Sequence, residues 1–478
     1  MSSIASQSIK GVIWSAVERF SLQGVQFFIG IVLARLLSPS DFGMIGMLTI
    51  FLSISQIFVD CGFSNALIRE KEVTDQDYGT AFLLNFLISV ACFGILFAIA
   101  PFVADFYQLP ELELVMQVVS LTLIINALFT VHKAKLSRAV DFKTQSKASF
   151  GAALLSGIFG VVLAYCGFGV WSLVWQSIAN SVLNLLIFSV LLRWFPKPCF
   201  NKASFHSLFS FGSKLLVSSL IHSVYSNLYN LVIGKKFTAS DLGYYTRADH
   251  LSSFPSLNVA SILSRVTFPI LSKLQDDNEK LLDVYKKYLQ LSCFSIFPLM
   301  IGLCVLAKPT IILLLGEKWS GAIILMQLLC FSTIFDPVCN INLNLLYVKG
   351  RSDLVLKLEI IKKTIAVIIL FASIPYGVTG MCFGKAFYGV IATFLNMIYT
   401  RRFIDLSIWG QLKLLTPSFM LSLLMGGFIW LVVGHCSGDL MQLIVGVAVG
   451  IGFYFASAYL FKMSSLQMLI SLAKRRGK

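Results

Sequence analysis

Basic side chains interrupt several of the long apolar stretches in this chain of 478 residues. They are Arg19 in the first stretch, Lys214 in the seventh, Arg265 in the eighth and Lys385 in the twelfth. Ionisable groups inside membrane-spanning segments are costly and by default suggest a function. Guanidinium groups bind phosphate oxygens in pairs, and ammonium groups supply a point charge. The four residues therefore predict a cationic cavity for a phosphate or pyrophosphate, although each alone could extend its charge to the membrane surface.

A second set of polar residues accompanies these cations. Arg19 recurs with Gln23 and Gln26 at three- and four-residue spacing, so the three share one helical face. Glu18 precedes Arg19, and Asp60 lies late in the second apolar stretch. We expect Glu18, Gln23, Gln26 and Asp60 to line the cavity with the cations. In the alternative interpretation, Glu18 and Arg19 neutralise each other or lie near the cytoplasmic surface.

Two short runs carry nearly the same sequence. Positions 40–43 read Ser-Asp-Phe-Gly, and positions 240–243 read Ser-Asp-Leu-Gly. An aspartate before a helix is typical of an N-cap, and a glycine beside it loosens the turn. We therefore predict structural or gating loops that contain Asp41, Gly43, Asp241 and Gly243. The second run follows the first after 200 positions. In a chain rich in apolar stretches, such a recurrence after about half the length indicates two related, like-oriented halves.

A proline inside the tenth apolar stretch predicts a further moving or structural part. Pro337 follows Asp336 there. A proline within a helix frees a backbone carbonyl and kinks the helix. We therefore group Pro337 with the gating or structural residues. A kink that is simply packed is the alternative.

The composition predicts an all-α membrane protein. Hydrophobic residues make up 57% of the chain, charged residues 13%, and the mean hydropathy is +0.82. A helix needs about 20 apolar residues to cross a bilayer, and about fourteen stretches meet this length. They lie near 11–36, 43–67, 79–103, 112–131, 149–166, 170–192, 209–233, 252–272, 288–307, 321–348, 355–374, 378–400, 414–434 and 441–461. The eighth is partly polar and is expected to face water or protein.

Basic residues set the orientation. Most of the 38 lysines and arginines fall in alternate connectors, which predicts that both termini are cytoplasmic. The net charge of +15 then reflects topology and attraction to anionic lipid headgroups, and not nucleic-acid binding. With the repeat, this topology predicts three regions: an N-terminal bundle of six helices over 1–205, a second over 206–405, and two further helices with a basic tail over 406–478.

Enzyme motifs are missing from the sequence. The chain contains no phosphate-binding loop, no Gly-x-Ser-x-Gly and no His-Glu-x-x-His. Its ten cysteines include no Cys-x-x-Cys pair, and its five histidines form no cluster at metal-binding spacing. We therefore expect a transporter without metal or cofactor, which draws on a Na⁺ or H⁺ gradient, the membrane potential or the substrate gradient.

Several segments resemble a known family in their order and spacing. They are 34–43, 135–143, 268–273, 307–309 and 316–319. Over nearly its whole length the chain is similar to the polysaccharide transporter family, in its colanic-acid-exporter-like branch. That family belongs to the multidrug/oligosaccharidyl-lipid/polysaccharide exporter superfamily. The resemblance implies two six-helix bundles followed by two more helices.

The resemblance also implies a function. It implies a flippase that carries an undecaprenyl-pyrophosphate-linked oligosaccharide from the cytoplasmic to the periplasmic leaflet of the bacterial inner membrane, for lipopolysaccharide or another surface polysaccharide. A polysaccharide polymerase and chain-length proteins are the implied protein partners. Related lipid II flippases carry essential arginines in their first and eighth helices, and Arg19 and Arg265 resemble these positions. Lys214 and Lys385 have no such support.

Two other functions remain open on the sequence. A cation-coupled multidrug extruder shares the superfamily fold, but its N-terminal cavity is typically acidic, and here only Glu18 and Asp60 could make it so. A membrane-bound polysaccharide polymerase or ligase usually needs a long external loop, which this chain lacks. Drug resistance that follows expression would favour the first alternative. Lipid-linked units that accumulate on the cytoplasmic side after deletion would argue against the second.

Overall fold

The computed structural model describes residues 21–70 and 72–469, apart from the side chains at 262, 263, 265 and 266. Over these residues the chain is helical and contains no strand. Its contacts divide it into two compact units, Met1–Gly243 and Tyr244–Lys478. The all-α prediction is confirmed.

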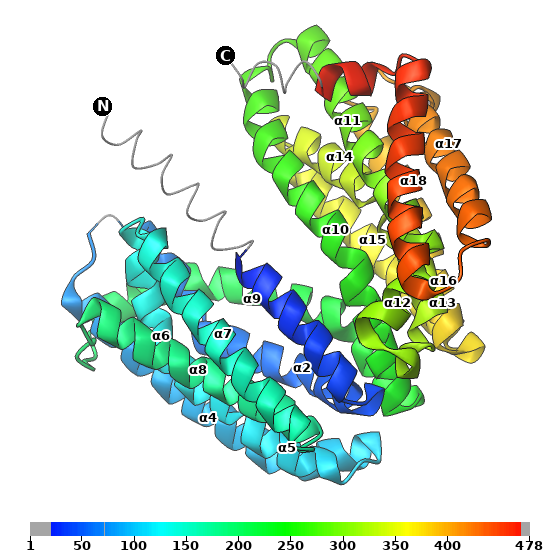
Figure 1. Cartoon of the computed structure of the whole chain (residues 1–478). Helices are drawn as coiled ribbons and strands as arrows, with labels where there is room; N and C mark the ends of the chain where they lie inside the picture. The colour runs from blue at the N-terminus through cyan, green and yellow to red at the C-terminus, as the bar shows by residue number, and fades with distance from the viewer. Residues whose placement is uncertain (1–20, 71, 470–478) are drawn as a thin grey trace. The chain divides into compact units, whose positions relative to one another are not determined.

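The first helix among the described residues of the first unit is Ser21–Leu36. It continues through α2 (Pro39–Asp60), α3 (Phe63–Arg69), α4 (Asp75–Tyr107), α5 (Glu111–Val119), α6 (Leu121–Arg138), α7 (Phe142–Tyr165), α8 (Val170–Leu192) and α9 (Lys202–Lys236). Helices α7 and α8 pack along each other, as do α2 and α9 (Figure 1). Helix α10 (Ala239–Lys273) begins in this unit and continues into the second.

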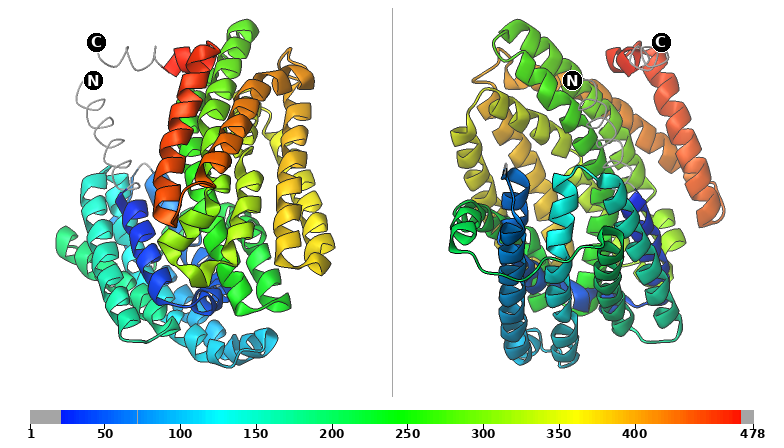
Figure 2. Two further views of the ribbon diagram at one scale, coloured as in Figure 1. Left: turned by 45° about the vertical axis from the view of Figure 1, so that its right-hand side comes forward. Right: turned by 90° about the vertical axis from the view of Figure 1, so that its left-hand side faces the viewer.

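The second unit continues with further α-helices and two short 3₁₀ turns. They are α11 (Asn278–Val305), α12 (Ala307–Leu315), η1 (Glu317–Trp319), α13 (Ala322–Thr333), α14 (Asp336–Val348), α15 (Ser352–Ser373), η2 (Ile374–Tyr376), α16 (Gly377–Thr400), α17 (Ile408–Val433) and α18 (Asp439–Leu460). Helix α17 packs on α11, and α18 lies beside α17. In Figure 2, α17 is orange and α18 is red. An aromatic and aliphatic core that includes Phe294, Met425 and Tyr454 joins these helices.

The boundary between the units lies one helix later than the predicted boundary after residue 205. Helix α9 opens the region predicted as 206–405, but it packs along α2 and α4 in the first unit. The last two helices, predicted as a separate region over 406–478, belong to the second unit. Helix α9 therefore belongs to the first unit because it packs against α2 and α4.

Ten helical stretches of the described chain are long and apolar enough to cross a membrane. One of them, Ser352–Thr400, contains both α15 and α16. Helices α9 and α10, each 35 residues long, correspond to the predicted spans at 209–233 and 252–272 but are too polar to be among the ten. The chain is thus a multi-pass membrane protein, and the count of fourteen spans stays a prediction.

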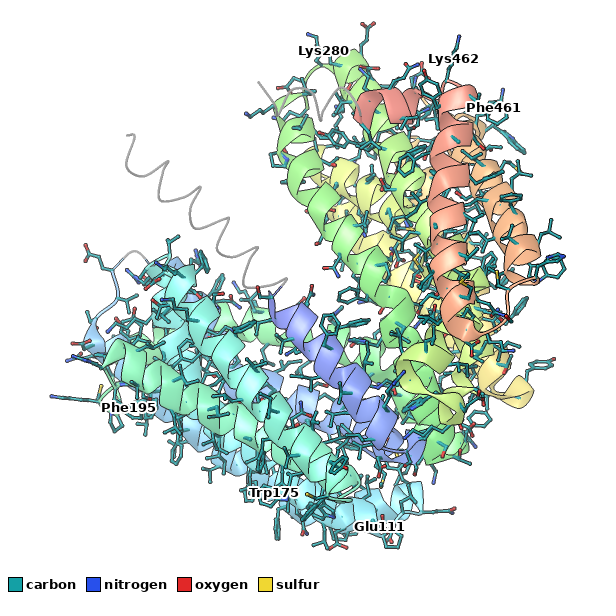
Figure 3. The ribbon with its side chains drawn as sticks, in the orientation of Figure 1. Glu111, Trp175, Phe195, Lys280, Phe461 and Lys462 are labelled. Carbon is teal, nitrogen blue, oxygen red and sulfur yellow. The ribbon has the colours of Figure 1, made fainter. Side chains whose placement is uncertain are left out.

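Labelled residues mark the ends of each unit in Figure 3. In the first unit, Glu111 and Trp175 lie at one end and Phe195 at the other (Figure 3). In the second unit, Lys280 and Lys462 lie at the same end (Figure 3). Alternate connectors of a multi-span bundle emerge on the same side of the membrane, and which side faces the cytoplasm stays a prediction.

Candidate functional site

A large polar cavity lies within the first unit. Its volume is about 1080 Å³, and α2, α3, α6, α8 and α9 contribute to its wall. Uncharged hydrogen-bonding side chains dominate the lining. They include Ser53, Gln56, Ser64, Asn65, Asn126, Thr130, Ser137, Asn180, Ser181, Ser218, Ser219, Ser223, Ser226 and Asn227. Asp60 and Lys133 supply one charge of each sign, and His222 adds an imidazole.

Hydrogen bonds between these side chains tie the wall helices together. The Ser53 and Ser223 hydroxyls lie 2.9 Å apart, and the Asn227 amide donates to the Ser53 hydroxyl at 3.3 Å. The Asn126 amide donates to the Gln56 carbonyl at 3.2 Å. The first network joins α2 to α9, and the second joins α6 to α2. Each amide retains further donors or acceptors that a bound polar molecule could use.

A helix break forms one wall of this polar cavity. Helix α2 ends at Cys61 and Gly62, whose φ angles of 46° and 71° are left-handed. A side chain on Gly212 of α9 would lie 2.3 Å from the Cys61 carbonyl oxygen, so the close approach requires glycine there. The break brings the Ser64 hydroxyl within 2.5 Å of the Asp60 carboxylate, to which it donates. Asp60 thus faces the cavity with one hydroxyl already bound.

The other residues predicted to line the cavity lie elsewhere or outside the described chain. Gln23 and Gln26 lie on the helix Ser21–Leu36, and neither lines the polar cavity. Glu18 and Arg19 lie outside the described residues. Arg265 lies on α10, but its side chain is not described. Of the four predicted polar residues, the structure therefore places Asp60 at this cavity.

Lys214 lines a separate, smaller cavity of about 530 Å³ in the first unit. Its side chain is exposed, and it lies one residue before Leu215, which lines the polar cavity. The structure therefore differs from the prediction of one cationic cavity. In the described part of the first unit, the larger cavity is polar and nearly balanced in charge, and Lys214 lies beside it.

Lys385 is held inside the second unit by an ion pair. Its ammonium lies 2.7 Å from the Asp249 carboxylate and 3.0 Å from the Tyr245 hydroxyl. The Lys385 side chain is 24% exposed and the Asp249 side chain 36%. Because a carboxylate of the same unit balances its charge, Lys385 is better placed to join α10 to α16 than to attract an anion.

Pro337 lies at a break and not at a kink within a continuous helix. Helix α13 ends at Thr333, and α14 begins at Asp336, so Pro337 occupies the first turn of α14. Proline is tolerated there because the first backbone N–H groups of a helix have no partner within the helix. The Ser256 hydroxyl donates to the Asp336 carboxylate at 3.4 Å beside this break.

The two Ser-Asp-x-Gly runs lie in the first turns of helices and not in loops. Asp41 accepts a hydrogen bond from the Ser38 backbone N–H at 2.8 Å, and its own N–H donates to the Ser38 hydroxyl. Asp241 and Thr238 form the same reciprocal pair at the start of α10. Such capping boxes satisfy two of the unpaired donors at a helix start. The aspartates therefore stabilise helix N-termini.

The two glycines allow a close backbone approach, which corrects the prediction that they loosen a turn. A side chain on Gly43 would lie 1.7 Å from the Ala239 carbonyl oxygen. A side chain on Gly243 would lie 1.9 Å from the Pro39 carbonyl oxygen. Each glycine thus contacts the first helical residue of the other repeat, and both residues are helical.

Sequence reasoning missed most of the cavity lining. Apart from Gln23 and Gln26, the predicted residues were charged, whereas the cavity is lined mainly by serines and asparagines. A signal was present in α9, where Ser219, Ser223 and Asn227 recur every four residues and so share one helical face. Helix α6 repeats it with Asn126 and Thr130. Uncharged polar faces inside apolar stretches were the better guide to this cavity.

The sequence is similar to proteins of polysaccharide biosynthesis. Residues 32–324 match the family model described as polysaccharide biosynthesis protein. The lipopolysaccharide biosynthesis protein WzxC of Escherichia coli (strain K12) is 26% identical, with 89% of this chain and 88% of that protein covered. The succinoglycan biosynthesis transport protein ExoT of Rhizobium meliloti (strain 1021) is 23% identical, with 98% and 96% covered.

Two solved structures share the fold. The lipid II flippase MurJ, in an inward closed conformation, has a TM-score of 0.73 at 16% identity, with 94% of this chain and 99% of that chain covered. An inward-facing multidrug resistance transporter of the MATE family has a TM-score of 0.62 at 15% identity, with 82% and 97% covered. At these identities the likeness shows the fold alone.

Proposed function

The chain belongs to the family of polysaccharide biosynthesis proteins, and from this premise we propose that it is a flippase for a lipid-linked oligosaccharide. The substrate class is a polyprenyl-pyrophosphate-linked glycan, carried from the cytoplasmic to the periplasmic leaflet of a bacterial inner membrane. The chain acts as a transporter and not as an enzyme. Relatives of nearly full length with names from lipopolysaccharide and succinoglycan biosynthesis support this assignment.

The observation that carries the proposal is the polar cavity of the first unit. Its serines and asparagines offer donors and acceptors in the same place, which matches the hydroxyl groups of sugars. Pockets for apolar drugs are lined mainly by hydrophobic and aromatic side chains. The lining of this cavity therefore favours a glycan over a lipophilic drug.

The transport cycle proposed here is alternating access, as is common for transporters built from repeated halves. We propose that both termini are cytoplasmic and that the glycan enters the polar cavity from that side while the polyprenyl chain stays in lipid. A Na⁺ or H⁺ gradient or the membrane potential supplies the energy. A polysaccharide polymerase and chain-length proteins then act on the exported units.

The test replaces a cavity amide by an apolar side chain. Asn65 is exposed on α3 at the cavity wall. We expect Asn65→Leu to lower the flipping rate of a fluorescent lipid-linked oligosaccharide in proteoliposomes by about tenfold, because each lost hydrogen bond to a sugar costs about 1 kcal/mol and the leucine also fills space. The measurement is the rate at which the label becomes accessible outside the vesicle.

Asn230→Leu is the matched control. Asn230 lies on α9 but does not line the polar cavity, so this variant should flip at the wild-type rate. Equal rates for Asn65→Leu and the wild type would contradict a glycan-binding role of the cavity. Wild-type protein that moves no lipid-linked oligosaccharide, but exports drugs when expressed in a sensitive strain, would overturn the proposed function.

A further inference from the structure

The smaller cavity of the first unit collects basic side chains beside the polar cavity. Its volume is about 530 Å³, and it lies where the end of α3 meets the beginning of α9. Arg69 and Glu70 line it from the α3 side, and His206, Phe211 and Lys214 line it from α9. We call it the basic pocket.

The two cations of the basic pocket have no carboxylate partner among the described residues. The structure forms no ion pair from Arg69 or Lys214 there, although Glu70 lines the same pocket. The Arg69 guanidinium carbon lies 4.6 Å from the centre of the Phe211 ring, a cation–π contact at the wall of the pocket. A guanidinium in such a contact keeps its N–H donors available for an anion.

Helix α3 separates the two cavities. Ser64, Asn65 and Ile68 face the polar cavity, whereas Ala66 and Arg69 face the basic pocket. These sets recur at three- and four-residue spacing on different faces of one short helix. On α9 the division falls between adjacent residues, since Lys214 lines the basic pocket and Leu215 the polar cavity. The two cavities are therefore next to each other.

We infer that the basic pocket binds the diphosphate group of the substrate while its first sugar occupies the polar cavity. This inference rests on the proposed function and deepens it. In a polyprenyl-pyrophosphate-linked glycan, the diphosphate is bonded directly to the first sugar, so the sites for the two groups must adjoin. Arg69 can bind two phosphate oxygens, and Lys214 adds a second charge. His206 and the pocket serine Ser210 can donate further hydrogen bonds.

Glu70 allows a test in which two kinds of substitution should change diphosphate binding in opposite directions. Its carboxylate lines the same pocket and repels a diphosphate. Removal of this charge should therefore strengthen binding, whereas removal of Arg69 and Lys214 should weaken it. A pocket that only contributes to folding would not respond in opposite directions to the two changes.

The experiment measures binding to the purified full-length protein in phosphatidylcholine nanodiscs, with fluorescent undecaprenyl pyrophosphate as the probe. We expect the R69Q/K214Q double variant to bind the probe at least about tenfold more weakly, and Glu70→Gln about twofold to fivefold more tightly. The control is K147Q/R401Q, since both residues are exposed and line neither cavity. It should bind within about twofold of the wild type.

Two further arms identify the source of the anion. Inorganic pyrophosphate should displace the probe from the wild type, and phosphatidylglycerol in the nanodisc should not. Equal displacement by phosphatidylglycerol would assign the basic pocket to ordinary lipid headgroups and overturn the inference. Unchanged binding by R69Q/K214Q, with folding verified by thermal unfolding, would overturn it as well.

The inference and the proposed function can fail separately. If R69Q/K214Q flips lipid-linked oligosaccharide at the wild-type rate, the basic pocket is not the diphosphate site, and the flippase assignment stands. If the wild type binds undecaprenyl pyrophosphate through Arg69 and Lys214 but flips no glycan-bearing lipid, the pocket stands and the proposed function falls.

Discussion

Single glycines permit close backbone contacts in the first unit. Gly43 lies in the first turn of α2, where a methyl group would overlap the Ala239 carbonyl oxygen at 1.7 Å. The obstacle is backbone and cannot rotate away. Gly43→Ala should therefore lower the free energy of unfolding by about 3 kcal/mol or more, at the upper end of overpacking effects.

Thermal unfolding of the purified variants in detergent checks this expectation. Gly94→Ala is the control, because Gly94 lies within α4 and a methyl group there meets no atom within 4 Å. Alanine is also the better helix former, so this variant should match or slightly exceed the wild-type midpoint. A Gly43→Ala midpoint equal to that of the wild type would mean that the first turns of α2 and α10 lie further apart.

Charged residues predicted for substrate contact divide into different roles in the structure. Lys214 is exposed and joins Arg69 at the basic pocket. Lys385 is paired with Asp249. The sequence identified both as intramembrane cations but could not distinguish them, because the pairing partner lies 136 positions away in the chain. A lysine stays available to a ligand when no carboxylate lies close to its ammonium group in the folded protein, and the residue type alone does not reveal this.

At the scale of elements, the Lys385–Asp249 pair joins α16 to α10 within the second unit. Asp249→Asn removes the charge that balances the half-buried ammonium, so it should destabilise the protein by about 1–3 kcal/mol. The double variant D249N/K385Q should recover part of this loss, because no unbalanced charge remains. Unfolding of the two single variants and the double variant gives the coupling free energy.

The exposed pair Lys287–Asp283 on α11 is the matched control. Its ion-pair distance is 2.6 Å, but its side chains are 53% and 60% exposed. Exposed pairs contribute about 0–1 kcal/mol, so Asp283→Asn should change stability little. Equal effects of Asp249→Asn and Asp283→Asn would show that the Lys385 pair contributes no more than a surface pair.

The helices themselves were largely predictable from the sequence, and the site was not. Long apolar stretches interrupted by polar connectors identify membrane spans. Backbone N–H and C=O groups in lipid have no water to bind, so a spanning segment satisfies them by forming a helix. The polar cavity required knowledge of which helix faces meet. Asn126 and Gln56 are 70 positions apart, and the sequence does not reveal that they share a wall. The need for glycine at position 43 could not be predicted from the sequence either, because it depends on a backbone oxygen in a helix far along the chain.

At the scale of the whole molecule, native cysteines can test the topology. Cys166 is exposed between α7 and α8, and Cys199 lies in the connector between α8 and α9. The predicted orientation places Cys166 in the periplasm and Cys199 in the cytoplasm. In variants that retain one of these cysteines and carry alanine at the other nine, we expect a membrane-impermeant maleimide to label Cys166 in intact spheroplasts.

Cys199 should react with the same reagent only after the membrane is permeabilised. It is half-buried, so a denatured sample provides the control for its intrinsic reactivity. Labelling of Cys199 in intact spheroplasts, with Cys166 protected, would reverse the orientation and place the entrance of the polar cavity on the opposite side.

The reciprocal glycine contacts have an evolutionary consequence. Gly43 meets the Ala239 carbonyl, and Gly243 meets the Pro39 carbonyl, with each residue offset by 200 positions from its counterpart. This is the relation found across a two-fold axis, in which residue i touches residue j and j touches i. A half-length ancestor that paired with a copy of itself would have needed this glycine once. Duplication and fusion of such an ancestor would account for a glycine at both position 43 and position 243 of this chain.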